Sequence, residues 1–472
     1  MNTICFTHAN PQYLPRVFLQ DDECVAGPHY SHWRKGGKWK FMNTPGGQFD
    51  YSIVTNQSEG VTSFDTIVVH ADSTMGCLPR NLPANATKVL LVGDTHHLSQ
   101  PIQKLIAYAA SEPFDAIVLW NRQHAHFFTE YGLQNIFWLP GLIFAIPEGR
   151  KFDNRKKQIA FFGQLGPHHP RRQRIVTALK AEGVSLVGGT MPRSDSLDLV
   201  AQSLASLNIS LNGEWNLRVF ETTSRGALLL TDRLSHYSGL SLFYPENESQ
   251  ITYDNSDELQ RSINQIIKNP DGISAIAQKG YETTQRHFSF AARKETFFAL
   301  VEDGITLDLF RLQGEPRCAL PIANREALVR RIQIYEWMQE LHRVNETVSI
   351  FLAPGVSPLV ISDLADLVRL NQHLIIDEAT FTDAWKPALA ELQIPNLNRL
   401  DETFDRLPAS SILVASIQDL DTLPIQKAVL GKQSAAVLIS DYHSDNTQLE
   451  EAMIKAGYKP NHDVLSGLYI KP

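Results

Sequence analysis

Short apolar runs alternate with amphipathic segments along most of this sequence of 472 residues. In the first third, the apolar runs are FDTIVVH (64–70), KVLLVGD (88–94), FDAIVLW (114–120) and NIFWLP (135–140). The segments LSQPIQKLIAYAASE and RQHAHFFTEYG, which lie between such runs, have the apolar spacing of helices. Continuous apolar runs separated by helices are typical of a parallel sheet that is covered on both faces. We therefore predict a Rossmann-like α/β domain.

The same alternation restarts twice. Beyond the charged stretch FDNRKK it resumes with QIAFFGQ (158–164), and we predict LDLVAQSLASLN (197–208) as a helix and ISLN (209–212) as a strand. From residue 324 a long helix, NREALVRRIQIYEWMQELHRV, precedes a third series of apolar runs. The predicted organisation is three α/β domains, over residues 1–148, 149–305 and 331–472, with 306–330 as a linker and helix start.

The composition narrows the class of protein. Hydrophobic residues make up 43% and charged residues 20%, as in soluble globular proteins with several cores. A net charge of -8 argues against bulk binding to nucleic acid. The four cysteines lack the spacing of a zinc site, so we expect reduced thiols and a cytoplasmic location. We expect no export signal and no transmembrane segment, because no apolar run approaches the roughly 20 residues that span a bilayer.

The stretch LNGEWNLRVFETTSRGALLLTD (211–232) predicts a ligand site at a sheet edge. Asn216 is a good helix N-cap and Gly226 stands where a helix usually ends. The spacing between them places Arg218 and Glu221 on one polar helix face, directly before an apolar strand. This face is suited to a polar ligand, although an Arg218 to Glu221 ion pair on a helix surface is the alternative.

A second loop, FFGQLGPHHPRR (161–172), has features of a phosphate site. Gly163 and Gly166 allow the backbone to approach a ligand closely, and Arg171 and Arg172 begin the following helix. The guanidinium fork suits phosphate oxygens, and a helix N-terminus favours anions. A diphosphate is one interpretation of this loop, and a solvated basic helix start is the other.

The densest polar cluster of the first domain is GDTHH (93–97), at the end of an apolar run. Asp94, His96 and His97 are candidates for a general base, because imidazole titrates near neutrality and a carboxylate can fix its tautomer. His70 and Asp72 form a second such group at the end of a neighbouring run. Loop histidines with backbone partners are the alternative in each case. The two histidines of GDTHH are adjacent, unlike the ligands of a helical zinc motif, so no metal site is predicted.

The order N-x-R-x-F-E-x-x-x-x-G, followed by a strand ending in Thr-Asp, then LFYPENESQITYDNSDEL and KGYETTQRHFSFAAR, resembles the nucleotide-sugar-binding half of GT-B glycosyltransferases. It is most similar to the spore-maturation-type relatives among the group 1 glycosyl transferases. The resemblance covers about 155–300. The matching residues are Asn216, Arg218, Phe220, Glu221, Gly226, Thr231, Asp232, Glu248, Tyr253, Glu258, Leu259, His287 and Arg293.

The resemblance implies a GT-B fold, in which two Rossmann-like domains face a cleft. Residues 1–148 would hold the acceptor and 149–305 the donor, with Glu221 on the nucleotide ribose. The superfamily separates two glutamates by seven residues, whereas six separate Glu214 from Glu221 here. The predicted donor-binding residues are Gly163, Arg171, Arg172, Asn212, Glu214, Asn216, Leu217, Arg218 and Glu221, and the predicted catalytic residues are Asp94, His96 and His97.

The activity that follows is transfer of a sugar from a UDP- or GDP-sugar to a glycan or protein acceptor, in polysaccharide or glycoprotein biosynthesis. Positive charge from Arg218, from Arg171 or Arg172 and from helix dipoles would stabilise the departing diphosphate, so we expect no metal or other cofactor to be required. The resemblance favours retention of the anomeric configuration. Two alternatives remain open: a bifunctional glycosyltransferase and methyltransferase, and a non-catalytic nucleotide-sugar-binding scaffold.

The third domain resembles a class I methyltransferase fold in shape, because it ends in a helix and a hairpin-like close. Its first strand and loop, VSIFLAPGVSPLV, lack the acidic glycine-rich turn of S-adenosylmethionine enzymes. Asp377 and Glu378 could still face a ribose. We expect a docking domain, with homodimerisation through it, more than a working methyltransferase.

Overall fold

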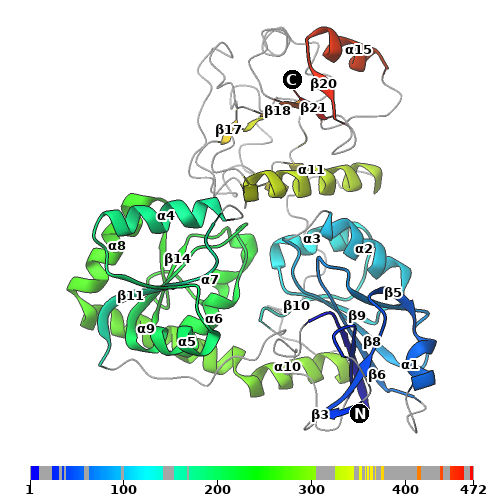
Figure 1. The fold of residues 1–472 in the computed structure, drawn as a ribbon, viewed down its shortest axis with the longest axis horizontal. Coiled ribbons are helices and arrows are strands. Elements are labelled where there is room, and N and C mark those ends of the chain that lie inside the picture. The colour runs from blue at the N-terminus through cyan, green and yellow to red at the C-terminus, as the bar shows by residue number, and fades with distance from the viewer. Residues whose placement is uncertain are drawn as a thin grey trace. The chain divides into compact units, whose positions relative to one another are not determined.

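The computed structural model of the protein (Figure 1) divides into two compact units, Met1–Glu315 and Pro316–Pro472. Each unit is described by itself. The structure describes residues 2–9, 24–30, 34–36, 39–57, 63–96, 100–141, 154–166, 169–303, 325–344, 350–352, 357, 359–360, 362–364, 367, 374–376, 412–415, 436–439, 447–461 and 468–470.

An eight-stranded sheet, in the order β10-β9-β8-β6-β1-β2-β4-β3, forms the first part of the N-terminal unit. All neighbouring strands in it are parallel except β3 and β4. Its strands are β1 (Thr3–Thr7), β2 (Cys24–Gly27), β3 (Arg34–Gly36), β4 (Trp39–Asn43), β6 (Thr66–Ala71), β8 (Thr87–Val92), β9 (Ala116–Leu119) and β10 (Ile136–Trp138). The four apolar runs predicted as strands in this part of the chain are therefore confirmed as β6, β8, β9 and β10.

Four helical segments and a two-stranded parallel sheet accompany these strands. They are α1 (Ser52–Gln57), α2 (Pro101–Ser111), η2 (Arg122–His124), α3 (Ala125–Glu130), β5 (Gly47–Asp50) and β7 (Cys77–Arg80). All residues of β6 and β9 are buried, as expected for strands covered on both faces. Because parallel strands end at one edge of a sheet, the polar residues after β6, β8 and β9 are brought to the same edge.

A five-stranded, fully parallel sheet in the order β12-β11-β13-β14-β15 forms the second part of this unit. Its strands are β11 (Lys156–Phe162), β12 (Leu186–Gly189), β13 (Ser203–Asn208), β14 (Leu228–Asp232) and β15 (Ile251–Tyr253). Its helical segments are α4 (Pro170–Ala181), α5 (Arg193–Gln202), α6 (Leu217–Ser224), η3 (His236–Ser238), α7 (Leu240–Phe243), α8 (Ser256–Lys268), α9 (Pro270–Phe288) and α10 (Phe290–Asp303).

Two apolar clusters cover the faces of this sheet. On one face, Ile159 and Phe161 of β11 pack with Val176 of α4 and Ile263 of α8. On the other face, Ala160 and Phe162 pack with Val200 of α5. The alternation along β11 reflects the two-residue period of a strand. Helices lie on both sides of the sheet (Figure 1), so the doubly covered arrangement predicted for this part of the chain is confirmed.

One boundary predicted in this sheet is wrong. The helix predicted over 197–208 is α5, which ends at Gln202, and the strand is β13 (Ser203–Asn208), not ISLN at 209–212. All six residues of β13 are buried between β11 and β14, where the small side chains of Ser203, Ala205 and Ser206 fit. Segment 209–212 instead belongs to the loop at the carboxyl end of that strand. The apolar residues of SLASLN also suited the helical period, so the sequence alone did not separate the two elements.

Helix α6 begins and ends as predicted. The side chain of Asn216 accepts a hydrogen bond from the backbone N–H of Arg218 at 2.9 Å, which caps the first turn. Gly226 follows the helix with a φ of 67°, a left-handed conformation that glycine adopts without strain. The chain then enters β14 at once, so the helix N-terminus and the strand end lie at the carboxyl edge of the sheet.

The C-terminal unit contains a six-stranded sheet in the order β17-β16-β18-β19-β21-β20. Strand β21 runs antiparallel to both of its neighbours, whereas β16, β17, β18 and β19 are parallel, which confirms the hairpin-like close. The elements are α11 (Arg325–Val344), β16 (Ile350–Leu352), β17 (Leu374–Ile376), β18 (Ile412–Ala415), β19 (Ala436–Ile439), α15 (Thr447–Lys455), β20 (Lys459–Pro460) and β21 (Leu468–Ile470). In the parts of the chain that the structure describes, no helix has the length and apolar character needed to cross a bilayer.

Candidate active site

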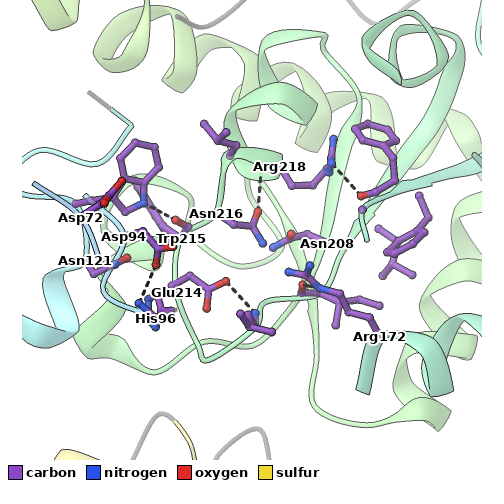
Figure 2. Close-up of a pocket in the computed structure, with 18 of the residues that line it drawn as sticks. Asp72, Asp94, His96, Asn121, Arg172, Asn208, Glu214, Trp215, Asn216 and Arg218 are labelled. Carbon is purple, nitrogen blue, oxygen red and sulfur yellow. Dashed lines mark hydrogen bonds between the residues drawn. The ribbon is translucent and has the colours of Figure 1, made fainter. Parts of the chain in front are cut away.

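A cavity of about 360 Å³ lies in the N-terminal unit, and residues from both of its main sheets line it. Figure 2 shows Arg172 and Arg218 on one side of this cavity and Asp72, Asp94 and Asn121 on the other. The lining residues are His70, Asp72, Asp94, His96, Trp120, Asn121, Phe161, Phe162, Gly163, Arg172, Leu207, Asn208, Ile209, Leu211, Glu214, Trp215, Asn216, Leu217 and Arg218.

Two arginines give the side formed by the second sheet its positive charge. The guanidinium of Arg172 donates from Nε to the carbonyl oxygen of Ile209 at 2.9 Å. Arg218 donates from Nη2 to the carbonyl oxygen of Phe162 at 2.9 Å, and its guanidinium lies 3.3 Å from the centre of the Phe162 ring. Burial lowers the pKa of both guanidinium groups, and nearby carboxylates oppose that shift. Arginine keeps its charge under such conditions, so the cavity presents two fixed cations.

Glu221 forms ion pairs with two arginines of the second-sheet side. Its Oε2 accepts from Nη1 of Arg218 at 2.8 Å, and its Oε1 accepts from Nε of Arg193 at 2.9 Å. The glutamate side chain is 7% exposed, whereas that of Arg193 is 36% exposed. The ion pair considered as an alternative is therefore present, but on a buried carboxylate that also orients Arg218 toward the cavity.

Two further carboxylates fix the loop between β13 and α6. Glu214 accepts from the backbone N–H groups of Leu211 at 2.9 Å and Asn212 at 2.6 Å. Asp232, at the end of β14, accepts from the backbone N–H and the hydroxyl of Ser210, at 3.1 and 2.5 Å, and from Nη1 of Arg171 at 2.9 Å. The loop therefore has a defined shape set by the protein's own side chains.

The side formed by the first sheet carries a buried polar network. Asp94 Oδ1 accepts from the backbone N–H of His96 at 2.8 Å (Figure 2), which closes a short turn after β8. Next to it, Nδ2 of Asn121 donates to Oγ1 of Thr95 at 2.9 Å, and that hydroxyl shares a hydrogen bond of 2.6 Å with Nδ1 of His124. The rings of His96 and His124 lie 4.9 Å apart. Asn121, which follows β9, is thus tied to the turn that follows β8.

His70 and Asp72 complete this side of the cavity. Nδ1 of His70 shares a hydrogen bond of 2.9 Å with the hydroxyl of Thr7, and burial lowers the pKa of the imidazole while Asp72 opposes the shift. At neutral pH His70 is therefore uncharged. Asp72 Oδ1 accepts from the backbone N–H of Thr74 at 2.9 Å and from its hydroxyl at 2.5 Å. The carboxylate follows β6 and keeps its place through this turn.

Three tryptophans join the two sides. Nε1 of Trp120 donates to the carbonyl oxygen of Trp215 at 2.7 Å, and Nε1 of Trp138 donates to the carbonyl oxygen of Trp120 at 2.9 Å. The rings of Trp138 and Trp215 lie 5.4 Å apart. Trp215 lies between Glu214 and Asn216 in the loop before α6. The hydrogen bond from Trp120 therefore links this loop to the end of β9.

The structure brings most of the predicted site residues together. The cavity is lined by Asp94, His96, Gly163, Arg172, Glu214, Asn216, Leu217 and Arg218. Three others stand behind the lining: Arg171 bonds to Asp232, Asn212 donates its backbone N–H to Glu214, and Glu221 pairs with two arginines. His97 lies outside the described residues.

Several lining residues were not predicted from the sequence. Asn121 and Trp120 follow β9 directly, so the rule that selected Asp94 at the end of β8 would also have selected them. Asn208 ends β13, whose position was predicted wrongly, and its Nδ2 donates to Oγ1 of Thr231 at 2.9 Å. Arg193, at the start of α5, is not a lining residue but pairs with Glu221, and it has no sequence signal that distinguishes it from a surface arginine. Among the residues that the structure describes, no group of three or more His, Cys, Asp or Glu side chains has the geometry to hold a metal ion.

The segment that forms the second sheet is similar to a known family of proteins. Residues 155–299 match a family model described as glycosyl transferase-like. No match was found among curated proteins.

Several solved structures are similar to this chain. HepE of Anabaena, in complex with UDP, has 11% sequence identity and a TM-score of 0.45, over 64% of this chain and 100% of that one. Sucrose-phosphate synthase from Thermosynechococcus elongatus has 10% identity and a TM-score of 0.44, over 64% of this chain and 99% of that one. TarM of S. aureus has 13% identity and a TM-score of 0.36 over 50% of this chain, which spans only 55% of the length of TarM.

The family match and the parallel α/β sheets agree with the fold class predicted from the sequence, a mixed α/β protein of GT-B type. The match covers the segment whose ordered motifs, from Asn216 to Arg293, carried the resemblance. Residues 155–299 are therefore similar to glycosyl transferase-like proteins, and the match is limited to this segment.

Proposed function

We propose that this protein is a glycosyltransferase that moves a sugar from a nucleotide diphosphate-sugar, with UDP or GDP as the nucleotide, to a hydroxyl group of a glycan or protein acceptor. One observation carries the proposal. A single cavity joins the cations Arg172 and Arg218, from the segment that matches the family, to Asp94 and His96 at the edge of the other sheet.

The cationic side suits the departing diphosphate. Two charged guanidinium groups and the N-terminus of α6 place positive potential beside Gly163, where the backbone has no side chain in the way. Stabilising the charge that develops on a leaving group is usually the largest single contribution to such catalysis. Arg172 and Arg218 would make that contribution, and Glu221 would orient Arg218 and bind the ribose.

The first-sheet side suits the acceptor. His96 is buried at the cavity wall, beside the Asp94 carboxylate and the ring of His124. An imidazole in this position can accept the proton of an acceptor hydroxyl or orient that hydroxyl through a hydrogen bond. We assign His96 this role, and Asp94 holds the turn that presents it.

Metal independence and retention of the anomeric configuration are part of the proposal and have separate tests. Transfer that persists at full rate after chelation of divalent metals supports the first. The configuration of the product, read by proton NMR from the coupling constant of the anomeric proton, tests the second.

A panel of UDP, GDP, UDP-glucose and GDP-mannose tests the function itself. A ligand at 100 times its dissociation constant stabilises the protein by about 2.7 kcal/mol, which a thermal-shift measurement detects. Stabilisation by one nucleotide and its sugar, with sugar transfer to an acceptor, supports the proposal. Binding without turnover of the donor would instead favour a non-catalytic scaffold, and binding of none would reject both.

A second candidate activity, methyl transfer, concerns the C-terminal unit. The observation behind it is the hairpin-like close, in which the antiparallel strand β21 lies between β19 and β20 at the end of a parallel sheet. Asp377 and Glu378 lie outside the described residues. Titration of the full chain with S-adenosylmethionine tests this second candidate, and an unchanged melting temperature at millimolar ligand would leave docking, including homodimerisation, as the role proposed for this unit.

A further inference from the structure

The two sides of the cavity differ in charge, and the difference bears on the acceptor. Arg172 and Arg218 are the lining arginines that the structure describes, and both belong to the part of the chain that forms the second sheet. Glu214 is a lining carboxylate on that side, and its two oxygens accept the backbone N–H groups of Leu211 and Asn212. The described lining residues of the first sheet include two carboxylates, Asp72 and Asp94, and a histidine, His70, that burial keeps neutral. The first-sheet side therefore repels anions, while the opposite side attracts them.

A buried amide, that of Asn121, lies on the same side of the cavity. Asn121 is 4% exposed, and its Nδ2 donates to Thr95. Among the described residues, Oδ1 of Asn121 has no hydrogen-bond partner. An unsatisfied buried acceptor is costly, and a hydroxyl group that donates to it would remove that cost. Asn121 thus adds an uncharged acceptor atom to the two carboxylates.

We propose that this side of the cavity selects acceptors whose reacting region carries uncharged hydroxyl groups and no phosphate or carboxylate. The inference rests on the proposed glycosyltransferase function and names the chemical class of its second substrate. Asp72 and Asn121 are the specificity-determining residues. Asp72 disfavours anionic acceptors by like-charge repulsion, and Asn121 accepts a hydrogen bond from a neutral hydroxyl.

Two substitutions separate the two contributions. Asp72→Asn removes the charge and keeps an oxygen for the hydrogen bonds from Thr74. Its matched control is Asp65→Asn, at the opposite end of β6, where the carboxylate accepts the backbone N–H of Asn2 at 2.8 Å. Asn121→Leu removes the amide oxygen. Its control is Gln123→Leu, which removes the buried amide of a residue two positions further along the chain. Gln123 does not line the cavity.

The experiment uses the full chain, with sugar-labelled UDP-glucose and GDP-mannose as donors. The acceptors are methyl glycosides of glucose, galactose and N-acetylglucosamine, each paired with its 6-phosphate, and methyl glucuronide. We expect at least about 10-fold greater kcat/KM for the uncharged member of a pair, since like charges as far as about 12 Å apart repel each other by that factor at an effective dielectric constant near 20. Asp72→Asn should shrink this ratio several-fold, and Asp65→Asn should leave it unchanged.

Asn121→Leu should lower kcat/KM for uncharged acceptors by about 10-fold to 100-fold with unchanged donor affinity, the usual cost of an unsatisfied group. Equal or better use of the phosphorylated or carboxylated acceptors overturns the proposal. So does a preference that Asp72→Asn leaves intact, or the absence of transfer to any of these sugars by a protein that binds the donor. Failure to bind either donor would reject the proposed function instead, so the two failures are distinguishable.

Discussion

The two sides of the cavity are built in different ways. On the second-sheet side, the side chains that carry charge are held by other side chains and by carbonyl oxygens, as Arg218 is by Glu221 and Phe162. On the first-sheet side, polar residues follow the ends of neighbouring strands of the sheet, and short turns hold them, as for Asp72 after β6 and Asp94 after β8. Burying a guanidinium needs compensating partners from elsewhere in the fold, whereas the carboxylates at the strand ends accept hydrogen bonds from residues two positions along the chain. The comparison teaches that the charged groups of the second-sheet side depend on contacts between distant parts of the sequence, whereas the polar groups of the first-sheet side depend on turns that directly follow strands.

The largest expected effect tests the polar residues of the first-sheet side. His96→Ala should lower the transfer rate by about 100-fold to 10,000-fold, the usual contribution of general acid-base catalysis, while donor affinity hardly changes. Transfer rate, donor binding and melting temperature are measured together on this variant and on Asp94→Asn. A histidine that only ties down its turn would lower the melting temperature and disturb both substrates. A near-parental rate in both variants would move the assignment to His70 and Asp72.

The next largest effect distinguishes Arg171 from Arg172 on the second-sheet side. Arg172 lines the cavity, whereas Arg171 bonds to the buried carboxylate of Asp232. Arg172→Met keeps the aliphatic stem and should weaken nucleotide-sugar binding by about 1.5 to 3 kcal/mol, the value of hydrogen bonds to charged groups. Arg171→Met should mainly lower the melting temperature, because it leaves Asp232 without its cation. Calorimetric titration of both variants with the nucleotide-sugar measures the two losses of affinity. Equal losses would indicate that Arg171 also contacts the nucleotide-sugar.

A smaller effect concerns Glu221 and its two arginines. Glu221→Ala should weaken binding of UDP or GDP by about 1 to 3 kcal/mol if the carboxylate accepts the ribose hydroxyls. Arg193→Met is the matched control, because it removes the more exposed partner and keeps the carboxylate and Arg218; a loss of at most about 1 kcal/mol is expected. The same titrations with the 2′-deoxynucleotide sharpen the test. An equal penalty from Glu221→Ala for both nucleotides would show that Glu221 acts without touching the 2′-hydroxyl.

The smallest expected effect is a pH dependence of stability from His70. Burial lowers the pKa of His70 in the folded protein. Below about pH 6.5, the usual pKa of histidine, the imidazole is therefore protonated more fully in the unfolded chain than in the folded one. Stability should therefore fall as the pH drops below 6.5, with a slope of up to about 1.4 kcal/mol per pH unit from this group. Urea unfolding at pH 7.5, 6.5 and 5.5 measures the slope. His70→Gln should flatten it, and parallel curves for parent and variant would contradict the assignment.

Much of the fold followed from the sequence because the apolar runs of a doubly covered parallel sheet are unambiguous. The strands β6, β8, β9 and β10, the capped helix α6 and the strand after it were all predictable. The failure at 203–212 has a local cause. Ser, Ala and Leu in SLASLN suit both a helix and a packed strand, and only the neighbouring strands of the folded sheet decide.

The site was predictable where residues follow a strand or begin a helix, as Asp94 and Arg172 do. It was not predictable where tertiary contacts decide which of two similar residues faces the cavity. Arg171 and Arg172 are adjacent in the sequence, but Arg171 bonds to Asp232 while Arg172 lines the cavity. The position of Asp232, which determines this difference, is known only from the fold. Likewise, Glu221 is paired with Arg193, which is 28 residues away and lies on another helix.

The carboxylates of Glu214 and Asp232 have a further consequence, through conformational entropy. Together they accept the backbone N–H groups of three successive residues, 210 to 212, in the loop that forms part of the cavity wall. Ordering a residue on binding typically costs about 1 to 2 kcal/mol of backbone entropy. Because this loop is ordered by groups of the same chain, a ligand does not bear that cost, and more of its interaction energy appears as affinity. The rigidity of the loop also limits the range of ligand shapes that fit against it, so the same two carboxylates favour tight binding and narrow the choice of ligand.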